Sequence, residues 1–131
     1  MNAESLLQAA LAAREHAVAP FSHYKVGAAL ECRNGKIYGG CNVENSTYGL
    51  TVCAERVALW KALSEGEREF VRVAVASQGS QPAPPCGACR QLLWEFGGNL
   101  EVILGNTEGY REVHHLAGLL PHPFDRGMLN K

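Results

Sequence analysis

The sequence predicts a three-layer α/β/α sandwich with a mixed sheet, both from the kinds of segment it contains and from the order of these segments. Segments with helical spacing alternate with short β-branched or alternating runs, in the order helix, hairpin, helix, strand, helix, strand, helix. This order is typical of helices that cover both faces of one sheet. The chain shows no internal repeat, low-complexity tract or linker, so residues 1–131 are expected to form a single domain.

The first part of the chain is expected to form a helix followed by a β-hairpin. Asn2 is a favourable N-cap, and apolar residues then recur at helical spacing until Pro20 ends the pattern. Asn34-Gly35 is a strong signal for a two-residue turn. It separates two strand-like runs at 26–32 and 37–42, which are rich in small residues, as expected for strands covered by helices.

The rest of the chain alternates between helical and strand-like patterns. Gly66 is well placed to end one helix in a left-handed conformation, and Gly97-Gly98 to end the next. The run Val71–Ala76 is β-branched and nearly continuous, which suits a central strand. The expected elements are helices at 52–65, 86–96 and 113–120, the last containing His114 and His115, and strands at 71–76 and 100–104.

Composition excludes several classes of partner. The net charge is −1, from 12 basic and 13 acidic residues, so no electrostatic footprint indicates duplex nucleic acid or an anionic membrane. No apolar run approaches the roughly 20 residues of a membrane span, and the N-terminus has no signal-peptide pattern. We therefore expect a cytoplasmic protein with a small-molecule substrate.

Five cysteines without a secretion signal indicate metal ligation or redox chemistry more than disulfides. Cys86 and Cys89 are three residues apart, which places them on one face of a helical turn, and Cys53 would supply a third ligand. All three lie at predicted helix N-termini, where the helix dipole favours the thiolate that zinc requires. Cys32 and Cys41 fall in the hairpin and are expected to act as small apolar side chains.

Two residues after Cys53, Glu55 is a candidate for moving protons beside the metal. Two residues along a helix rotate by roughly 200°, so Glu55 and Cys53 can converge only if the first turn is distorted. Arg56 is expected to donate hydrogen bonds to the ligand sulfurs, and Gln91 is a weaker candidate for the same role. With no fourth cysteine nearby, the fourth metal position is expected to stay open for water.

These residues resemble the signature of the cytidine deaminase family. Cys53-Ala54-Glu55-Arg56, followed by a Pro-Cys-x-x-Cys motif that ends with Arg90-Gln91, fits the zinc-deaminase pattern. A cysteine as first ligand is similar to the nucleoside-acting members more than to the deoxycytidylate, tRNA or polynucleotide deaminases, which usually carry histidine there. The resemblance also covers residues 20–24, 26–30, 40–45 and 119–124, and so spans nearly the whole chain.

The resemblance implies a cytidine deaminase-like sandwich with a mixed five-stranded sheet. It also implies one Zn²⁺ per subunit, held by Cys53, Cys86 and Cys89, with Glu55 as the catalytic proton shuttle. The implied reaction is hydrolytic deamination of cytidine and deoxycytidine to uridine and deoxyuridine plus ammonia, in pyrimidine salvage.

Four further positions correspond to residues that bind the nucleoside in this family. The resemblance implies that Asn42 and Glu44 hold the ribose hydroxyls and that the backbone of Ala54 reads the edge of the base. Tyr24 occupies a position where a Phe commonly packs on the pyrimidine. Without the resemblance, Asn42 and Glu44 would be read as ordinary polar residues that follow a strand.

Tyr48 and Phe124 resemble positions that reach a neighbour's active site, which implies a homotetramer with shared sites. Three alternatives remain open. The chain could deaminate another aminopyrimidine nucleoside, such as blasticidin S, or be a non-catalytic zinc- or nucleoside-binding module. A Cys-x-x-Cys pair also occurs in thiol redox sites. The intact Glu55 argues against both non-deaminase alternatives, because neither a structural zinc nor a redox site uses an unligated carboxylate.

Overall fold

A computed structural model describes residues 2–129, and its central layer is a five-stranded sheet. The spatial order is β2-β1-β3-β4-β5. β1 pairs antiparallel with both β2 and β3, β3 pairs parallel with β4, and β4 pairs antiparallel with β5. The expected mixed, five-stranded sheet is therefore confirmed. The strands are β1 (Gly27–Cys32), β2 (Ile37–Cys41), β3 (Phe70–Ser77), β4 (Glu101–Asn106) and β5 (Arg111–His115).

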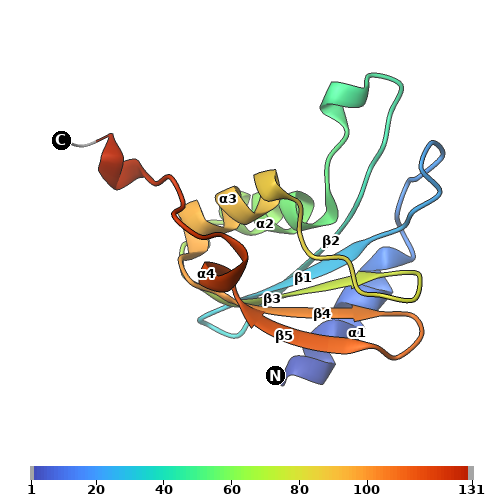
Figure 1. The fold of residues 1–131 in the computed structure, drawn as a ribbon, viewed down its shortest axis with the longest axis horizontal. Helices are drawn as coiled ribbons and strands as arrows, with labels where there is room; N and C mark the ends of the chain where they lie inside the picture. The colour runs from blue at the N-terminus through green and yellow to red at the C-terminus, as the bar shows by residue number, and fades with distance from the viewer. Residues whose placement is uncertain (1, 130–131) are drawn as a thin grey trace.

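Helices cover both faces of this sheet, as Figure 1 shows, so the expected three-layer architecture is confirmed. α1 packs alone on one face, and α2 and α3 lie beside each other on the other, joined there by the short α4. No described helix is long and apolar enough to cross a membrane. The helices are α1 (Ala3–Arg14), α2 (Ala54–Ser64), α3 (Gly87–Gly97) and α4 (Leu116–Leu119), with 3₁₀ turns η1 (Tyr48–Leu50) and η2 (Arg126–Met128).

α1 begins at the predicted cap and lies directly on the sheet. The side chain of Asn2 accepts a hydrogen bond from the Ser5 amide at 2.8 Å. Leu6 and Leu7 are completely buried against the sheet. The helix passes so close to β1 that a β-carbon on Gly27 would lie 2.0 Å from a backbone oxygen of α1. Glycine at this position therefore sets the distance between α1 and the sheet.

α2 lies equally close to β2, on the opposite face. The turn before β2 lies at the predicted place but is longer than the predicted two residues. The Cys32 amide donates to the Lys36 carbonyl at 2.9 Å, so the loop is 33–35, and its last residue, Gly35, has φ +92°. Within β2, a β-carbon on Gly40 would lie 2.5 Å from the amide nitrogen of Ala58. β2 is an edge strand, and the ammonium group of Lys61 donates to the Gly39 carbonyl on it.

The prediction of a final helix at 113–120 is wrong for its first half. Residues up to His115 form β5, with His114 and His115 on this strand, and the helix is limited to Leu116–Leu119. Along β5, exposed and half-buried residues alternate, which is the two-residue period of a strand with one face on the protein. α1 also ends at Arg14, before the predicted limit at Pro20.

Candidate metal centre

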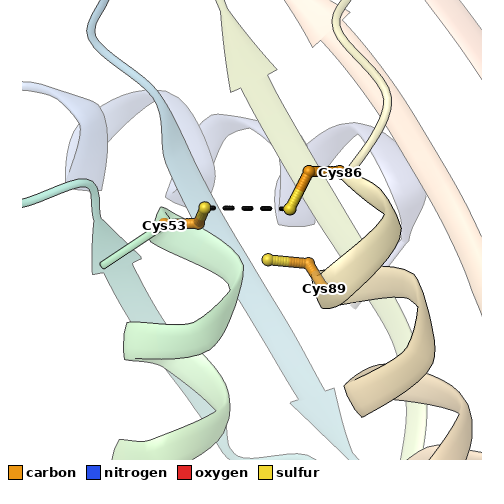
Figure 2. Close-up of side chains that lie close together, drawn as sticks. All are labelled: Cys53, Cys86 and Cys89. Atoms are coloured by element: carbon orange, nitrogen blue, oxygen red, sulfur yellow. Dashed lines mark hydrogen bonds between the residues drawn. The ribbon is translucent and has the colours of Figure 1, made fainter. Parts of the chain in front are cut away.

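The first turns of α2 and α3 bring three thiols together. Cys53 is the N-cap of α2, Cys86 is the N-cap of α3, and Cys89 lies in the first turn of α3. Figure 2 shows the three side chains pointing toward one another from these two helices. All three sulfurs lie within 4.8 Å of one another, and those of Cys53 and Cys86 are 3.9 Å apart. The spacing pattern in the sequence thus corresponds to a real cluster.

The cluster fits a tetrahedral zinc ion. Zinc–thiolate bonds of about 2.3 Å at tetrahedral angles place two sulfurs about 3.8 Å apart. The distance from Cys53 to Cys86 matches this value, and none of the three cysteines is in a disulfide. The other two cysteines lie apart from the cluster, in strands: Cys32 is buried and Cys41 is half-buried.

Hydrogen bonds favour a thiolate at Cys53. The bond from Cys89, and after it the bond from Arg56, lowers the pKa of Cys53 to about 5. The Nη2 of Arg56 lies 3.5 Å from the Cys53 sulfur. The pKa of Cys89 is raised, first because this thiol donates to Cys53 and then because it is buried. The cluster therefore already concentrates negative charge on sulfur, which is the charge that a metal cation neutralises.

Glu55 lies beside the cluster because Cys53 precedes the helix. Cys53 has extended backbone angles, φ −73° and ψ 153°, so the helical rotation of roughly 200° does not separate the two residues. Both line the same cavity. Glu55 is only 5% exposed, and burial raises its pKa to about 7. The carboxyl group is thus held in a dry site beside the thiols.

The cavity above the thiols has a volume of about 270 Å³. It brings together five of the predicted site residues besides the cysteines, namely Tyr24, Asn42, Glu44, Ala54 and Glu55. Among the described residues that line it, none is Lys, Arg or His. Such a cavity suits a small, uncharged ligand. The lining is Ser22, Tyr24, Val26, Asn42, Glu44, Thr51, Val52, Cys53, Ala54, Glu55, Val75, Ala83, Pro84 and Cys86.

Asn42 and Glu44 also hold the loop that contains Tyr24. The Asn42 amide donates to the Tyr24 carbonyl at 2.8 Å and accepts from the Val26 amide at 2.9 Å. Glu44 accepts from the amides of Phe21 and Ser22 and from the Ser22 hydroxyl. These bonds, led by the Ser22 hydroxyl, hold the pKa of Glu44 below its ordinary value of 4.5. The cavity therefore presents Glu44 as a fixed carboxylate.

Ser22 was not predicted as a site residue, and the sequence gives little signal for it. A serine in an exposed loop is common, and its partner is 22 residues away in the chain. Only the fold reveals that the Ser22 hydroxyl bonds Glu44 and that both residues line the cavity.

Besides Cys89 and Arg56, three predicted site residues lie outside the cavity lining. The Gln91 amide donates to the carbonyl of Phe124, which anchors the C-terminal tail to α3, so its predicted bond to sulfur stays a prediction. Phe124 is 54% exposed and Tyr48 is 72% exposed. The Tyr48 ring packs edge-on against Phe21, with ring centroids 5.5 Å apart.

Together, the three-layer fold and the thiol cluster below a small-molecule cavity define a metal-binding α/β protein of the zinc-deaminase class. The chain belongs to the cytidine and deoxycytidylate deaminase family. The family profile described as "Cytidine and deoxycytidylate deaminase zinc-binding region" matches residues 1–105. This match and the cysteine cluster confirm the expected cofactor, one zinc ion per chain.

Individual relatives agree over nearly the full length. The chain is 44% identical over 131 residues to a cytidine deaminase of Halalkalibacterium halodurans, covering 99% of each chain. It is 46% identical to a cytidine deaminase of Sporosarcina psychrophila, covering 96% of this chain and 93% of that one. Among solved structures, a cytidine deaminase from Burkholderia pseudomallei superposes with a TM-score of 0.92 at 50% identity. That match covers 95% of this chain and 100% of the other.

Proposed function

We propose that this chain is a zinc-dependent enzyme that hydrolyses cytidine and deoxycytidine to uridine and deoxyuridine, releasing ammonia. The observation that carries this proposal is the position of Glu55, a buried carboxyl group that lies beside three converged thiols and lines a small-molecule cavity. A structural zinc site has no use for such a carboxylate. Relatives that are 44–46% identical over nearly the whole chain are named cytidine deaminase.

Cys53, Cys86 and Cys89 would hold the zinc ion, which would lower the pKa of water and so supply a nucleophile near neutral pH. Glu55 would accept one proton from the attacking water and donate it to N3 of the cytosine ring as the water oxygen bonds to C4. It would then accept the proton of the new C4 hydroxyl group and donate it to the amino group, which leaves as ammonia when the C4–N bond breaks and the C4 carbonyl forms. Water and cytidine thus become uridine and ammonia, and Glu55 returns to its starting form.

Three thiolates would leave the metal electron-rich, and this chain has two means of withdrawing that charge. Arg56 donates to the Cys53 sulfur, and the N-terminal ends of α2 and α3 point their partial positive charge at the cluster.

The cavity favours a nucleoside over a nucleotide. We assign Asn42 and Glu44 to the ribose hydroxyls, the Tyr24 ring to the pyrimidine face, and the Ala54 backbone to the edge of the base. A fixed carboxylate at Glu44 accepts hydrogen bonds from hydroxyl groups and repels phosphate. None of the described residues that line the cavity is a Lys, Arg or His that would pair with a phosphate.

The assembly proposed here is a homotetramer with shared active sites, which acts in the cytoplasm in pyrimidine salvage. Tyr48 and Phe124 support it, because both are highly exposed and lie outside their own chain's cavity. Leu50, which lies on η1 with Tyr48, is also 68% exposed. Apolar side chains exposed in this way are typical of surfaces that a partner covers.

The direct test is the ultraviolet absorbance of cytidine incubated with the zinc-replete protein and, separately, with its Glu55→Gln variant. We expect the cytidine spectrum to disappear with the wild type only, while both proteins retain one zinc per chain. Removing a general acid–base is expected to cost at least about 10²-fold in kcat. No change with wild type carrying one zinc would contradict cytidine as the substrate. Other aminopyrimidine nucleosides, blasticidin S among them, would then be tested, followed by binding without turnover.

A further inference from the structure

Gln78, just after β3, binds the loop that carries Tyr24 although it does not line the cavity itself. Its Nε2 donates to the His23 carbonyl at 3.1 Å, and its Oε1 accepts from the Lys25 amide at 3.3 Å. The two bonds hold the backbone on either side of Tyr24. Residues 21–25 are all exposed, so the loop depends on such bonds for its position.

Arg14, at the end of α1, fixes the orientation of this amide. Its Nη2 donates to Oε1 of Gln78 at 2.7 Å, and its Nε donates to the Lys25 carbonyl at 3.0 Å. Both partners of Oε1 can only donate, and the His23 carbonyl can only accept, so the Gln78 amide has a single orientation that satisfies all of them. Arg14 reaches this position because α1 passes directly over Gly27.

The same end of β3 also holds a second segment of the cavity lining. The Ser77 hydroxyl accepts from the Ala83 amide at 3.2 Å, in the segment that continues through Pro84 to Cys86. Tyr24 lines the cavity, and so do Ala83, Pro84 and Cys86. Ser77 and Gln78 are adjacent in the chain, so both of these lining segments are bound to the same end of β3.

We propose that Gln78, oriented by Arg14, is a positioning residue that sets the distance between Tyr24 and the Ala83–Cys86 segment of the cavity lining, and so determines affinity for the nucleoside. This inference rests on the proposed function only for the identity of the ligand. Gln78 touches none of the reacting groups, so its effect is on binding. This role could not be predicted from the sequence, because the partners of Gln78 lie 53 to 64 residues away.

The test compares Gln78→Ala and Gln78→Glu with a matched control, Gln8→Ala. Gln8 is an exposed glutamine on α1 whose side-chain amide donates to Glu4 at 3.1 Å. Gln78→Ala is expected to raise KM for cytidine about tenfold and to leave kcat within about twofold, with one zinc retained. Gln8→Ala is expected to change neither constant.

Gln78→Glu separates positioning from general stability. One oxygen of the new carboxylate can still accept from Arg14 and Lys25. The other oxygen replaces the amide nitrogen that donated to the His23 carbonyl, so this hydrogen bond is lost. We expect KM to rise as in Gln78→Ala, while Tm stays within about 3 °C of wild type because the pair with Arg14 gains charge. If KM follows Tm across the variants, or stays unchanged in Gln78→Ala, the positioning role is contradicted.

Hydrogen exchange of the free proteins tests, without turnover, whether Gln78 holds the loop that carries Tyr24. Exchange of the Lys25 amide is expected to be faster in Gln78→Ala than in wild type and Gln8→Ala. Equal exchange in all three would overturn the proposal. This measurement needs no substrate, so it tests whether Gln78 holds the Tyr24 loop even if the wild type does not consume cytidine. That second result would refute only the proposed function.

Discussion

Gly40 of β2 faces the amide nitrogen of Ala58 in α2 so closely that a β-carbon at Gly40 would stand 2.5 Å from it. The added β-carbon would also lie 2.6 Å from the carbonyl oxygen of Ala54. Real β-carbon contacts are not this short, so α2 can lie at its present depth only over glycine. Since Cys53 and Glu55 are at the start of α2, the depth of this helix also places the metal ligand and the carboxylate.

Gly40→Ala is therefore expected to destabilise the fold. The added methyl group must push α2 away from β2, and such overpacking typically costs about 1–3 kcal/mol. Urea unfolding measures the loss. Gly118→Ala is the control, because a β-carbon at Gly118 would meet nothing within 4 Å, and its effect should be within about 0.5 kcal/mol. Equal stability of the two variants would show that α2 shifts without cost.

Arg56→Ala is expected to slow the reaction without removing zinc. Loss of the donor to Cys53 leaves a more electron-rich sulfur and a weaker Lewis acid, for which we expect about a 10- to 100-fold lower kcat. Arg56→Lys keeps the charge but not the planar donor geometry, so its kcat should lie between those of the wild type and Arg56→Ala. Steady-state kinetics with zinc quantified in each sample provides the measurement. An unchanged rate at unchanged zinc content would remove Arg56 from the mechanism.

Ser22→Ala is expected to raise the pKa of Glu44 toward its ordinary value of 4.5, since the Ser22 hydroxyl is the main cause of the lowered pKa. A carboxyl group whose pKa is lowered by folding stabilises the fold fully above its unfolded pKa, and this contribution is lost as the pH falls through the folded pKa. The stability difference between wild type and Ser22→Ala should thus be largest above about pH 5 and shrink below it.

Carbon-13 NMR titration of Glu44 and denaturation at several pH values check both parts of that prediction. Ser5→Ala, at an exposed serine of α1, is the matched control and should leave the pKa of Glu44 in place. A pKa for Glu44 that is the same in all three proteins would contradict the role given to Ser22.

Zinc removal is expected to destabilise the protein. A ligand that binds only the folded state adds about 4 kcal/mol when its concentration is 1,000 times Kd. Thermal unfolding with and without a chelator should show this difference in wild type. It should also appear in Cys41→Ser, whose thiol lies in β2, but vanish in Cys86→Ser. If Cys86→Ser responded to the chelator like wild type, the three-cysteine site would be wrong.

Phe124→Ala is expected to lower kcat/KM by about tenfold or more, because Phe124 is proposed to complete the cavity of a neighbouring subunit. Subunits that carry Glu55→Gln still supply Phe124, so mixing the two variants should restore part of the activity. Light scattering gives the oligomeric state of each sample. A fully active monomer would contradict the shared site.

Local signals carried much of the prediction. Asn2 as a cap, Asn34-Gly35 as a turn and the run Val71–Ala76 as a strand each depend on neighbours in the chain, and each lies where predicted. The pairing of Cys53 with the Cys-x-x-Cys motif was also visible, because both segments open helices.

What could not be predicted depends on distant or weak signals. β5 is an edge strand of five residues with polar side chains on both faces, so its two-residue period was hidden, and its end was taken for a helix. Ser22 and Gln78 act through partners 22 to 64 residues away, and polar side chains of this kind have no local pattern that identifies a distant partner.

Lys61 bears on how copies of this chain can associate. An edge strand such as β2 offers unpaired backbone groups to which another strand can add. In this chain the carbonyl of Gly39 is already taken by the ammonium group of Lys61, which also places a positive charge at the rim of the sheet. Addition of another strand at this edge is thus disfavoured at Gly39, so contacts between copies of the chain along β2 are expected to involve side chains.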